Sequence, residues 1–222
     1  LEGNNSCHTG WLKSAGMLMP MGYMIGQGMV DVQGDQDDIE SLRTTIEAHF
    51  DTATIPESGA QYYGYSGAFE CMTAGTGDVA FAKTSSYEDH CEGNEWCLDR
   101  DEYRMLEPAF GQVPTHPVMV DPTQIDSEKQ DAFVAAMLAM SSEMWVEDYP
   151  MGDTNYTGCY SMTTHQVADI PQNTCGGEIL QNVLENNGAV VSVTSQDHLG
   201  SYSDAIANIP GISAYFDDKY GS

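Results

Sequence analysis

Basic residues are scarce in this chain of 222 residues, which has seven lysines and arginines against 34 aspartates and glutamates. The formal charge of -27 argues against nucleic acids and anionic membrane surfaces as partners, because both require basic patches. Apart from the run at 31–40 the acidic residues are dispersed, which is typical of a solvated acidic surface and not of a disordered tail. We expect a saline or marine source, since dissolved salt screens the repulsion among these charges.

Long apolar runs are also missing. No stretch has the length and hydrophobicity of a membrane span, and the residues that begin at Leu1 do not form a signal peptide. We therefore expect the chain to be processed or truncated at its N-terminus. Its length suffices for a buried core in one large or two small domains.

The CxxC pattern is absent, although the chain has six cysteines. An even number of cysteines without CxxC predicts disulfides in an exported protein; reduced, buried thiols are the alternative. Six thiols allow about fifteen pairings, so the sequence alone does not choose among them. Nearness in sequence favours Cys91–Cys97 and Cys159–Cys175. Two N-glycosylation sequons, at Asn4 and Asn155, fit the same extracellular location.

Apolar periodicity and turn signals predict an α/β fold, in which helices alternate with short apolar strands. The expected helices cover 14–29 with an interruption at Pro20, 37–50, 62–71, 127–145, 178–185 and 198–209. The expected strands cover 78–82, which should be buried and parallel, 118–120 and 189–193. Residues 52–60 and 151–175 are expected to form loops. The methionines within 14–29 indicate flexible core packing in preference to a soft metal site.

An anion site is indicated by the stretch SCHTGWLKSAG at residues 6–16, which combines a turn with a helix start. Thr9 is a good N-cap residue, and the small residues at 14–16 let a ligand approach the backbone closely. The free N–H groups and positive dipole end of a helix attract anions, and Lys13 adds a full positive charge. An ordinary capped helix is the alternative interpretation of this stretch taken alone.

Two further stretches accompany it, QYYGYSGAFEC at 61–71 and QVPTH at 112–116. Together the three resemble segments of the transferrin family that carry the bound anion, one iron-binding tyrosine and the iron-binding histidine. GDVAFAK (77–83) and CLD (97–99) fall between them in the family's order, and HLGSYSDAIANI (198–209) resembles the end of a transferrin lobe. The resemblance is dense from residue 6 to about residue 120 and thinner beyond.

The resemblance implies a fold and a disulfide. A transferrin lobe has a two-domain, periplasmic-binding-protein-like α/β architecture with mixed sheets and an interdomain cleft. Residues 1–113 would form the anion-binding, tyrosine-bearing domain, and 114–222 would return to the other domain and add the C-terminal helix. The N-terminal part of the lobe would be missing, and the acidity would fit an algal, marine or halotolerant member. The same resemblance implies a Cys7–Cys71 disulfide.

The resemblance further implies ferric iron, Fe3+, bound together with carbonate or bicarbonate. Ferric iron prefers oxygen donors and accepts imidazole, and its charge can displace the proton of a tyrosine, whose pKa is ordinarily about 10. By motif, Tyr65 is one tyrosine ligand and His116 is the histidine ligand. Taken alone, the local sequence favours a core aromatic at Tyr65 and a structural histidine at His116, and the family context reverses both interpretations.

The carbonate would lie at the helix start within 6–16. By motif Thr9 would donate its hydroxyl, Lys13 would supply charge, and the backbone N–H groups of Ala15 and Gly16 would complete the cradle. The family usually has an arginine where this chain has Lys13. Because a lysine is a point charge without the planar fork of arginine, we expect weaker or more acid-labile binding. The motif gives His8 no ligand role.

The family's other two ligands, an aspartate and a second tyrosine, belong to a part of the lobe that precedes Cys7. We therefore expect the missing N-terminal segment of the same lobe or precursor to be a partner of this chain. Lys83 matches one of two lysines that repel each other on acidification in some lobes, but the matching later region has no second lysine. Acid release is then expected to depend on His116 and the carbonate, and Lys83→Gln should change it little.

The favoured function is that of a secreted, extracellular or cell-surface binding protein. It would capture and transport ferric iron with carbonate and release it on acidification, with an uptake receptor as a further partner. The alternative is a transferrin-fold interaction or inhibitor module that has lost iron binding, an interpretation supported by Lys13 and the missing segment. An enzyme is disfavoured, since Ser14 and Ser66 lack a nucleophile-elbow motif and no acid, base and orienting residue can be grouped.

Overall fold

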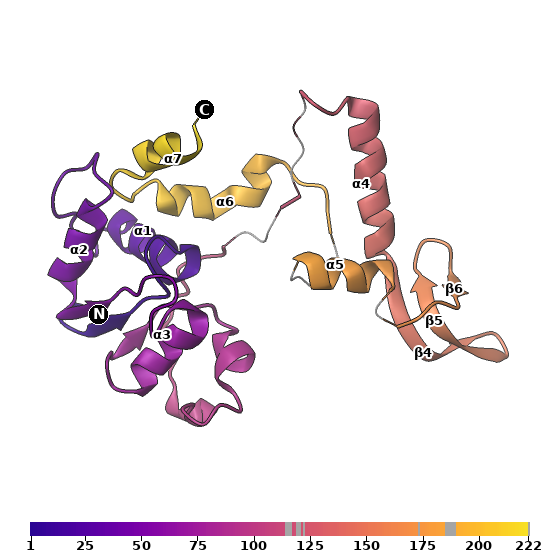
Figure 1. Ribbon diagram of the computed structural model, residues 1–222, viewed down its shortest axis with the longest axis horizontal. Helices are drawn as coiled ribbons and strands as arrows, with labels where there is room; N and C mark the ends of the chain where they lie inside the picture. Colours follow the sequence, from indigo (N-terminus) through magenta and orange to yellow (C-terminus); the bar gives the residue numbers. More distant parts are fainter. Residues whose placement is uncertain (114–116, 119–120, 122, 173, 185–189, 222) are drawn as a thin grey trace. The chain divides into compact units, whose positions relative to one another are not determined.

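The computed structural model describes residues 1–113, 117–118, 121, 123–172, 174–184 and 190–221 (Figure 1). The chain divides into two compact units: Leu1–Val113 with Leu199–Ser222 form unit 1, and Pro114–His198 form unit 2. The assignment of 1–113 and 114–222 to the two domains of a lobe, with a cleft between them, stays a prediction.

Unit 1 contains a three-stranded parallel sheet. β1 (Asn5–Cys7) lies between β2 (Thr52–Thr54) and β3 (Val79–Ala80). The strand predicted at 78–82 is therefore confirmed as parallel, although β3 is shorter than the predicted run. Parallel neighbours require crossover connections, and the segments between these strands are helical.

The first crossover contains three helical segments. η1 (Ser14–Leu18) is a π-helical turn that runs directly into α1 (Met19–Gly26), and α2 (Ser41–His49) leads to β2. The predicted helix over 14–29 is thus confirmed in its main part, and its geometry changes from π to α next to Pro20. The helix predicted over 37–50 is confirmed from Ser41 onward.

The second crossover is α3 (Gly64–Thr73), which contacts β1 and β3 and confirms the helix predicted at 62–71. Beyond β3 the chain forms two short helical turns, η2 (Tyr87–Cys91) and η3 (Arg100–Glu102). The core of unit 1 lies between α1, α2 and the strands, with Leu42, Ile46, Phe50 and Phe81 buried. Methionines 17, 19, 21 and 24 are each 3 % exposed or less, so the methionine stripe is core packing.

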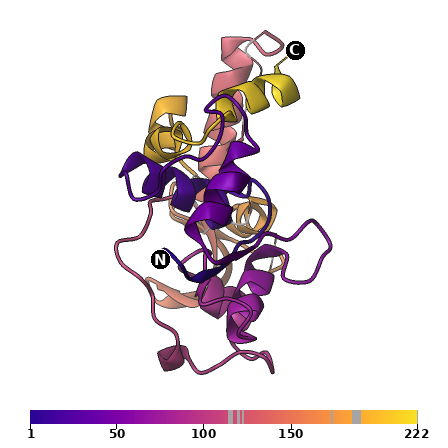
Figure 2. The same ribbon diagram turned by 90° about the vertical axis from the view of Figure 1, so that its left-hand side faces the viewer.

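The C-terminal segment also packs in unit 1. α6 (Ser195–Ile206) is kinked at Gly200, and α7 (Ile212–Tyr220) follows it. The Asn208 side chain donates to the Gly22 carbonyl over 3.2 Å, and both views show α6 beside α1 (Figures 1 and 2). The sequence predicts the first helix at 198–209 but misses α7, because that helix begins directly after the Pro210-Gly211 pair that signals a helix end.

Unit 2 combines two helices with an antiparallel sheet in the order β4–β5–β6. These elements are α4 (Ser127–Ser141), β4 (Glu143–Met151), β5 (Thr154–Ser161), β6 (Gln166–Ala168) and α5 (Gly176–Leu184). The helix predicted at 178–185 is confirmed as α5. The β4–β5 hairpin turns at Gly152, whose φ of 62° suits glycine.

Three predictions for unit 2 are wrong. For the helix expected over 127–145 only the end is wrong: α4 is confirmed from Ser127 but ends at Ser141, where the Ser141 and Ser142 hydroxyls donate to carbonyls of the last turn and the chain enters β4. The loop expected over 151–175 contains β5 and β6. The strand expected at 189–193 is irregular chain over its described part, 190–193. Most of the strand expected at 118–120 lies outside the described residues.

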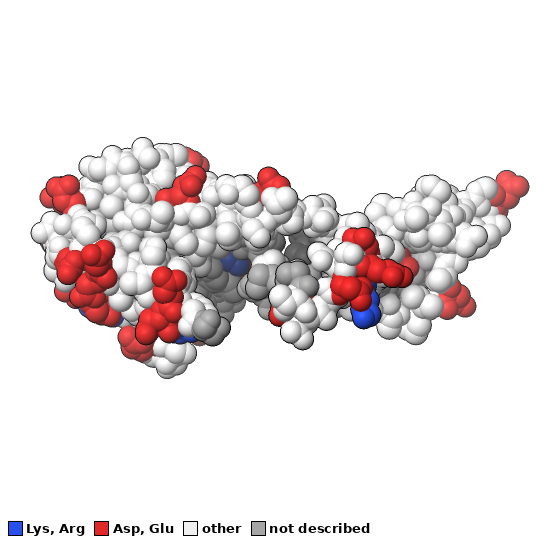
Figure 3. All heavy atoms as spheres, turned by 90° about the horizontal axis from the view of Figure 1, so that it is seen from above, with Lys and Arg blue, Asp and Glu red and all other residues white. Residues whose placement is uncertain are grey.

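The surface is acidic, as the composition predicts. Figure 3 shows acidic side chains in separate patches over the visible face, with few basic ones among them. The acidic run is exposed from Gly34 to Asp38 and ends at α2, where Glu40 pairs with Arg43 over 3.3 Å. In the part of the chain that the structure describes, no helix has both the length and the apolar character of a membrane span.

Candidate anion and metal site

β1 leads directly into the stretch that the sequence identifies as an anion site. The Cys7–Cys71 disulfide joins the end of β1 to α3, and the His8 backbone N–H donates to the Thr54 carbonyl over 2.9 Å. The Thr9 carbonyl in turn accepts from the N–H of Gly64, the first residue of α3, over 2.9 Å. The anion stretch and the start of the tyrosine-bearing helix are therefore held together by backbone contacts and a covalent bond.

The helix that follows begins at Ser14 and not directly after Thr9. A loop with positive φ at Gly10 and Leu12 separates Thr9 from the helix, and Lys13 is the N-cap residue before Ser14. The prediction that Thr9 caps this helix is therefore wrong. The loop moves the threonine out of the capping position and leaves its side chain free for another role.

The Thr9 hydroxyl is buried and lacks a partner. The residue is 2 % exposed, and its Oγ1 makes no hydrogen bond to any described residue. An unpaired buried polar atom costs on the order of 1–3 kcal/mol, so it indicates strain, an unplaced water or a ligand. A Cβ added to Gly16 would overlap the Thr9 side chain, so this close approach requires glycine at position 16.

The first turn of η1 presents backbone N–H groups next to this hydroxyl. The N–H groups of Met17 and Leu18 both donate to the Lys13 carbonyl, over 2.9 and 3.0 Å. Those of residues 14–16 precede the helical hydrogen-bonding pattern. Since η1 continues into α1, the positive dipole end of the combined helix lies here, at Ala15 and Gly16.

Lys13 supplies a positive charge at the same helix start. Its Nζ lies 5.3 Å from the centroid of the Tyr63 ring, and a hydrogen bond from the ammonium lowers the pKa of the Tyr63 phenol. The Tyr63 ring also lies so close to Gly10 that a Cβ there would be 2.8 Å from it. This contact of Tyr63 is not predictable from the sequence, because nothing in the run QYYGY distinguishes it from a core aromatic.

Tyr65, the predicted iron ligand, is half-buried near the start of α3. Its ring stacks on that of His90, with centroids 5.8 Å apart and planes 6° from parallel. The Nζ of Lys83 lies 4.8 Å from the centroid of the same ring, so the lysine singled out by motif is a neighbour of Tyr65. Burial raises the pKa of the Tyr65 phenol, and a metal ion would have to displace this proton before the phenolate could bind it.

Comparison with known proteins finds similarity to the transferrin family. The transferrin family model matches residues 49–120, which include the segment of Tyr65. The serotransferrin of Oryzias latipes is 26% identical over 93% of this chain and 32% of its own length. The ovotransferrin of Gallus gallus is 32% identical over 48% of the chain and 17% of its own length. The melanotransferrin of Homo sapiens is 27% identical over 55% of this chain and 22% of its own length.

This chain is similar to members of the transferrin family. The relationship is distant and covers part of one lobe, and the chain spans about a third or less of the length of these relatives. Transferrins form a family of binding proteins without enzymatic activity. The mixed α/β content, with one parallel and one antiparallel sheet, is consistent with a transferrin lobe.

The histidine that the transferrin resemblance assigns to iron, His116, lies outside the described residues. The structure therefore gives no distance between His116 and Tyr65. Among the described residues, no three or more histidine, cysteine, aspartate or glutamate side chains are grouped as metal ligands. A site with Tyr65 and a single histidine would not form such a group, because tyrosine is not among these residue types. The assignments of Tyr65 and His116 as iron ligands therefore stay predictions.

Three disulfides stabilise this chain, and they join the pairs expected from the transferrin resemblance and from nearness in sequence. Besides Cys7–Cys71 they are Cys91–Cys97 and Cys159–Cys175. The sequon residues Asn4 and Asn155 are both exposed, so a glycan could be attached at either, and their glycosylation stays a prediction.

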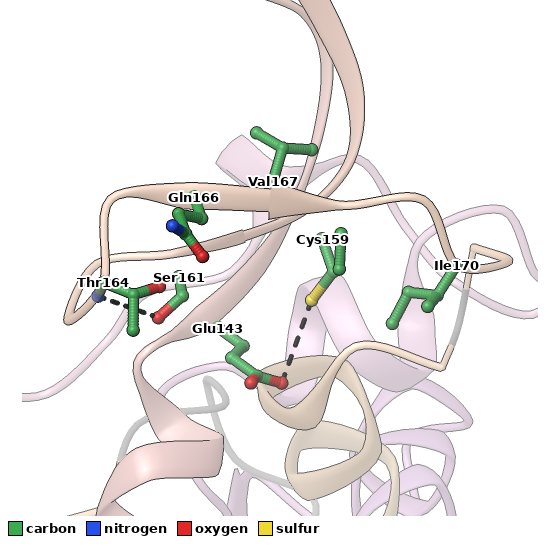
Figure 4. Close-up of a pocket in the computed structure, with 8 residues that line it drawn as sticks. Glu143, Cys159, Ser161, Thr164, Gln166, Val167 and Ile170 are labelled. Atoms are coloured by element: carbon green, nitrogen blue, oxygen red, sulfur yellow. Dashed lines mark hydrogen bonds between the residues drawn. The ribbon is translucent and has the colours of Figure 1, made fainter.

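Two small cavities are lined by residues other than Thr9. The first, of about 220 Å³, is in unit 2 between β4, β5 and β6 (Figure 4). Its one carboxylate, Glu143, accepts from the Gly176 N–H over 3.1 Å at the start of α5, so this group is already used within the fold. The second, of about 210 Å³, is in unit 1, where Ser14 and the Tyr202 hydroxyl lie 3.0 Å apart.

Proposed function

We propose that this chain is part of a secreted protein that binds and transports ferric iron together with carbonate and releases both on acidification. The observation that carries the proposal is the buried, unpartnered hydroxyl of Thr9 beside a helix start that also bears Lys13. A hydroxyl donor, free backbone N–H groups and an ammonium group together suit a small oxyanion. Similarity to the transferrin family supports the proposal.

The proposed anion cradle consists of Thr9, Lys13, Ala15 and Gly16. The Thr9 hydroxyl would donate to one carbonate oxygen, and the N–H groups of Ala15 and Gly16 would donate to others. Lys13 would balance the negative charge, and its hydrogen bond to Tyr63 would have to be shared or exchanged. Carbonate, when bound, supplies oxygen ligands and negative charge to the metal ion.

For the iron we propose Tyr65 and His116 as protein ligands from this chain. A phenolate oxygen and an imidazole nitrogen are both suitable donors for ferric iron. Two protein ligands do not fill its coordination shell, and we propose that another segment of the same lobe or precursor supplies the remaining donors. The limited span of the chain relative to its relatives supports this suggestion.

Acid release would follow from the protonation of the ligands. Iron binds the deprotonated phenolate, so binding releases a proton and affinity falls as the pH falls. Burial raises the pKa of Tyr65 and so strengthens the competition from protons, which moves release toward higher pH. Protonation of His116 and of the carbonate would act in the same direction.

The first prediction concerns the absorption of the iron complex. Addition of ferric nitrilotriacetate to the native full-length protein should produce a visible phenolate-to-iron charge-transfer band, present with bicarbonate and absent without it. Tyr65→Phe should abolish the contribution of this site, because it removes the phenolate and keeps the ring. Tyr62→Phe, three residues earlier in the same run, is the matched control and should retain the band. A band that survives Tyr65→Phe unchanged would refute the assignment.

An interaction or inhibitor module that has lost iron binding is the second candidate. The observation that favours it is the position of the Lys13 ammonium over the Tyr63 ring, 5.3 Å from its centroid, where the family usually has an arginine. The same titration separates the two candidates, since such a module would give no bicarbonate-dependent band.

A further inference from the structure

His8 is a fully buried titratable group to which the motif gives no ligand role. Its side chain is 0 % exposed and its ring stacks on Phe81, with centroids 5.0 Å apart. Its Nδ1 lies 2.9 Å from the carbonyl oxygen of Gly16, and its Nε2 lies 3.1 Å from the hydroxyl oxygen of Ser6 on β1. The imidazole of His8 therefore connects β1, through Ser6, with η1, through Gly16.

The partners determine the protonation state of the ring. A carbonyl oxygen can only accept, so His8 Nδ1 must carry the proton of the bond to Gly16. In the neutral ring Nε2 is then an acceptor for the Ser6 hydroxyl, whose other acceptor is the Thr52 carbonyl at 3.4 Å. Burial lowers the pKa of His8 to about 4, so the ring stays neutral throughout the physiological range.

Pro20 cannot supply an α-helical donor to the Gly16 carbonyl, which itself lies in the π-helical turn η1. In an α-helix the carbonyl of residue 16 would accept from the N–H of residue 20, and proline has no N–H. His8 supplies a donor to this carbonyl from outside the helix. The bond therefore holds the helix at Gly16. The N–H of Gly16 belongs to the proposed anion cradle, and its Cα lies next to the Thr9 hydroxyl.

We propose that His8 is a positioning residue of the anion site, which fixes the first turn of the helix against Thr9 through its bond to the Gly16 carbonyl. This inference rests on the proposed function, because it concerns the same cradle. His8 does not touch the anion itself. It sets the direction of the Ala15 and Gly16 N–H groups, since the peptide groups of one helical turn move together.

Two variants isolate the bond to Gly16. In asparagine the amide nitrogen is as many bonds from Cα as His8 Nδ1, so His8→Asn retains an N–H donor at that place. In leucine a methyl group is at the same place, so His8→Leu has no donor. Both variants lose the acceptor for Ser6, and the difference between them reports the Gly16 bond alone. His49→Leu is the matched control, because both histidines pack edge-on against Phe50, His8 with centroids 6.1 Å apart, but His49 lies at the end of α2.

The first measurement needs no ligand. Amide hydrogen exchange of the iron-free, native full-length protein should be faster over residues 9–18 in His8→Leu than in the wild type, His8→Asn or His49→Leu. Equal exchange in His8→Leu and the wild type would overturn the proposal. Should the leucine variant fail to fold, the 15N shifts of the wild-type imidazole decide: protonated Nδ1 is expected, and a proton on Nε2 would overturn the proposal.

The second measurement is bicarbonate affinity, followed by ultraviolet difference spectra of the iron-free protein. We expect half-saturation to require about five- to tenfold more bicarbonate in His8→Leu, as loss of one hydrogen bond predicts, and within about twofold of the wild-type amount in His8→Asn and His49→Leu. Equal losses in the leucine and asparagine variants would overturn the positioning role. A wild-type protein that binds no bicarbonate would refute the proposed function, and the exchange data would then decide whether His8 fixes this turn.

Discussion

At the scale of single residues, the surroundings of Tyr65 determine how readily its phenol loses the proton that a metal ion must displace. The ring stacks on His90, and the exposed ammonium of Lys83 lies 4.8 Å from its centroid. Burial is the cause that raises the pKa of the phenol, and it does not depend on Lys83. An exposed charge is screened by water and salt, so it should contribute little to proton competition at Tyr65.

Lys83→Gln should therefore leave acid release almost unchanged. We expect the pH at which half the iron is released to shift by less than about 0.3 units, since an exposed charge has a weak effect. The loss of the visible band during acid titration measures this value. Lys219→Gln is the matched control, because Lys219 lies over the Tyr215 ring in the same way, 5.3 Å from its centroid. A shift of a full pH unit in Lys83→Gln alone would contradict this account.

At the scale of elements, the start of η1 is held from two sides. His8 reaches the helix from β1, and Tyr202 reaches it from α6, where its hydroxyl lies 3.0 Å from Ser14 Oγ. Ser14 is the first residue of η1, so the C-terminal segment contacts the helix directly where the proposed anion cradle begins. A contact between residues 188 positions apart in sequence contributes to stability only in the folded unit.

Tyr202→Phe should lower the free energy of unfolding of unit 1 by about 1 kcal/mol, because it removes one partly buried hydrogen bond and keeps the ring. Urea unfolding followed by fluorescence measures the change. Tyr215→Phe is the matched control: it lies beside the same cavity, but its hydroxyl bonds the exposed Lys219, so the loss should be smaller. Equal losses in both variants would show that the Ser14 contact has no special weight.

The local pattern of apolar residues predicted some helices and strands correctly. It failed for strands that form only by pairing with another strand. A helix with a clear apolar face, such as α2, was predictable, and so was the apolar strand β3. The β4–β5 hairpin was not, because Glu143–Met151 becomes a strand through its antiparallel partner, and the adjacent helical pattern of α4 extends into it. The capping role of Thr9 failed because the fold places a loop between it and the helix.

The sequence predicted which segments contribute to the candidate site, but not how their side chains contact one another. The sequence motifs are enough to single out Thr9, Lys13 and Gly16 as residues of an anion site. They give no sign that Lys13 bonds Tyr63 or that His90 stacks on Tyr65, since both contacts join residues through the fold. The role of His8 has a partial signal in the sequence, namely Pro20 four residues beyond Gly16, which could not donate to that carbonyl if the turn were α-helical.

For the molecule as a whole, the dominant physical property is its charge. A net charge of -27 disfavours the compact state through self-repulsion, and the acidic groups are spread over the surface (Figure 3). Screening by salt should therefore stabilise the fold. The melting temperature should rise by several degrees between about 10 mM and 0.5 M sodium chloride, mostly below about 0.2 M, where the screening length shortens most.

Thermal unfolding by circular dichroism at several salt concentrations tests this expectation. The same series at pH 4, where many carboxylates are protonated, is the internal control and should show a smaller increase. A melting temperature that does not change with salt at neutral pH would mean that the acidic side chains are too far apart to destabilise the fold.

The central claim is that a hydroxyl without a partner in the fold is reserved for an anion, and Thr9→Val in the native full-length protein tests it most directly. Valine keeps the shape and removes the unsatisfied atom, so the free energy of unfolding should stay the same or rise by up to about 1 kcal/mol. The bicarbonate concentration that half-saturates the iron complex should nevertheless increase about five- to tenfold. Unchanged bicarbonate dependence would contradict the account, as would a loss of binding that merely follows a loss of stability.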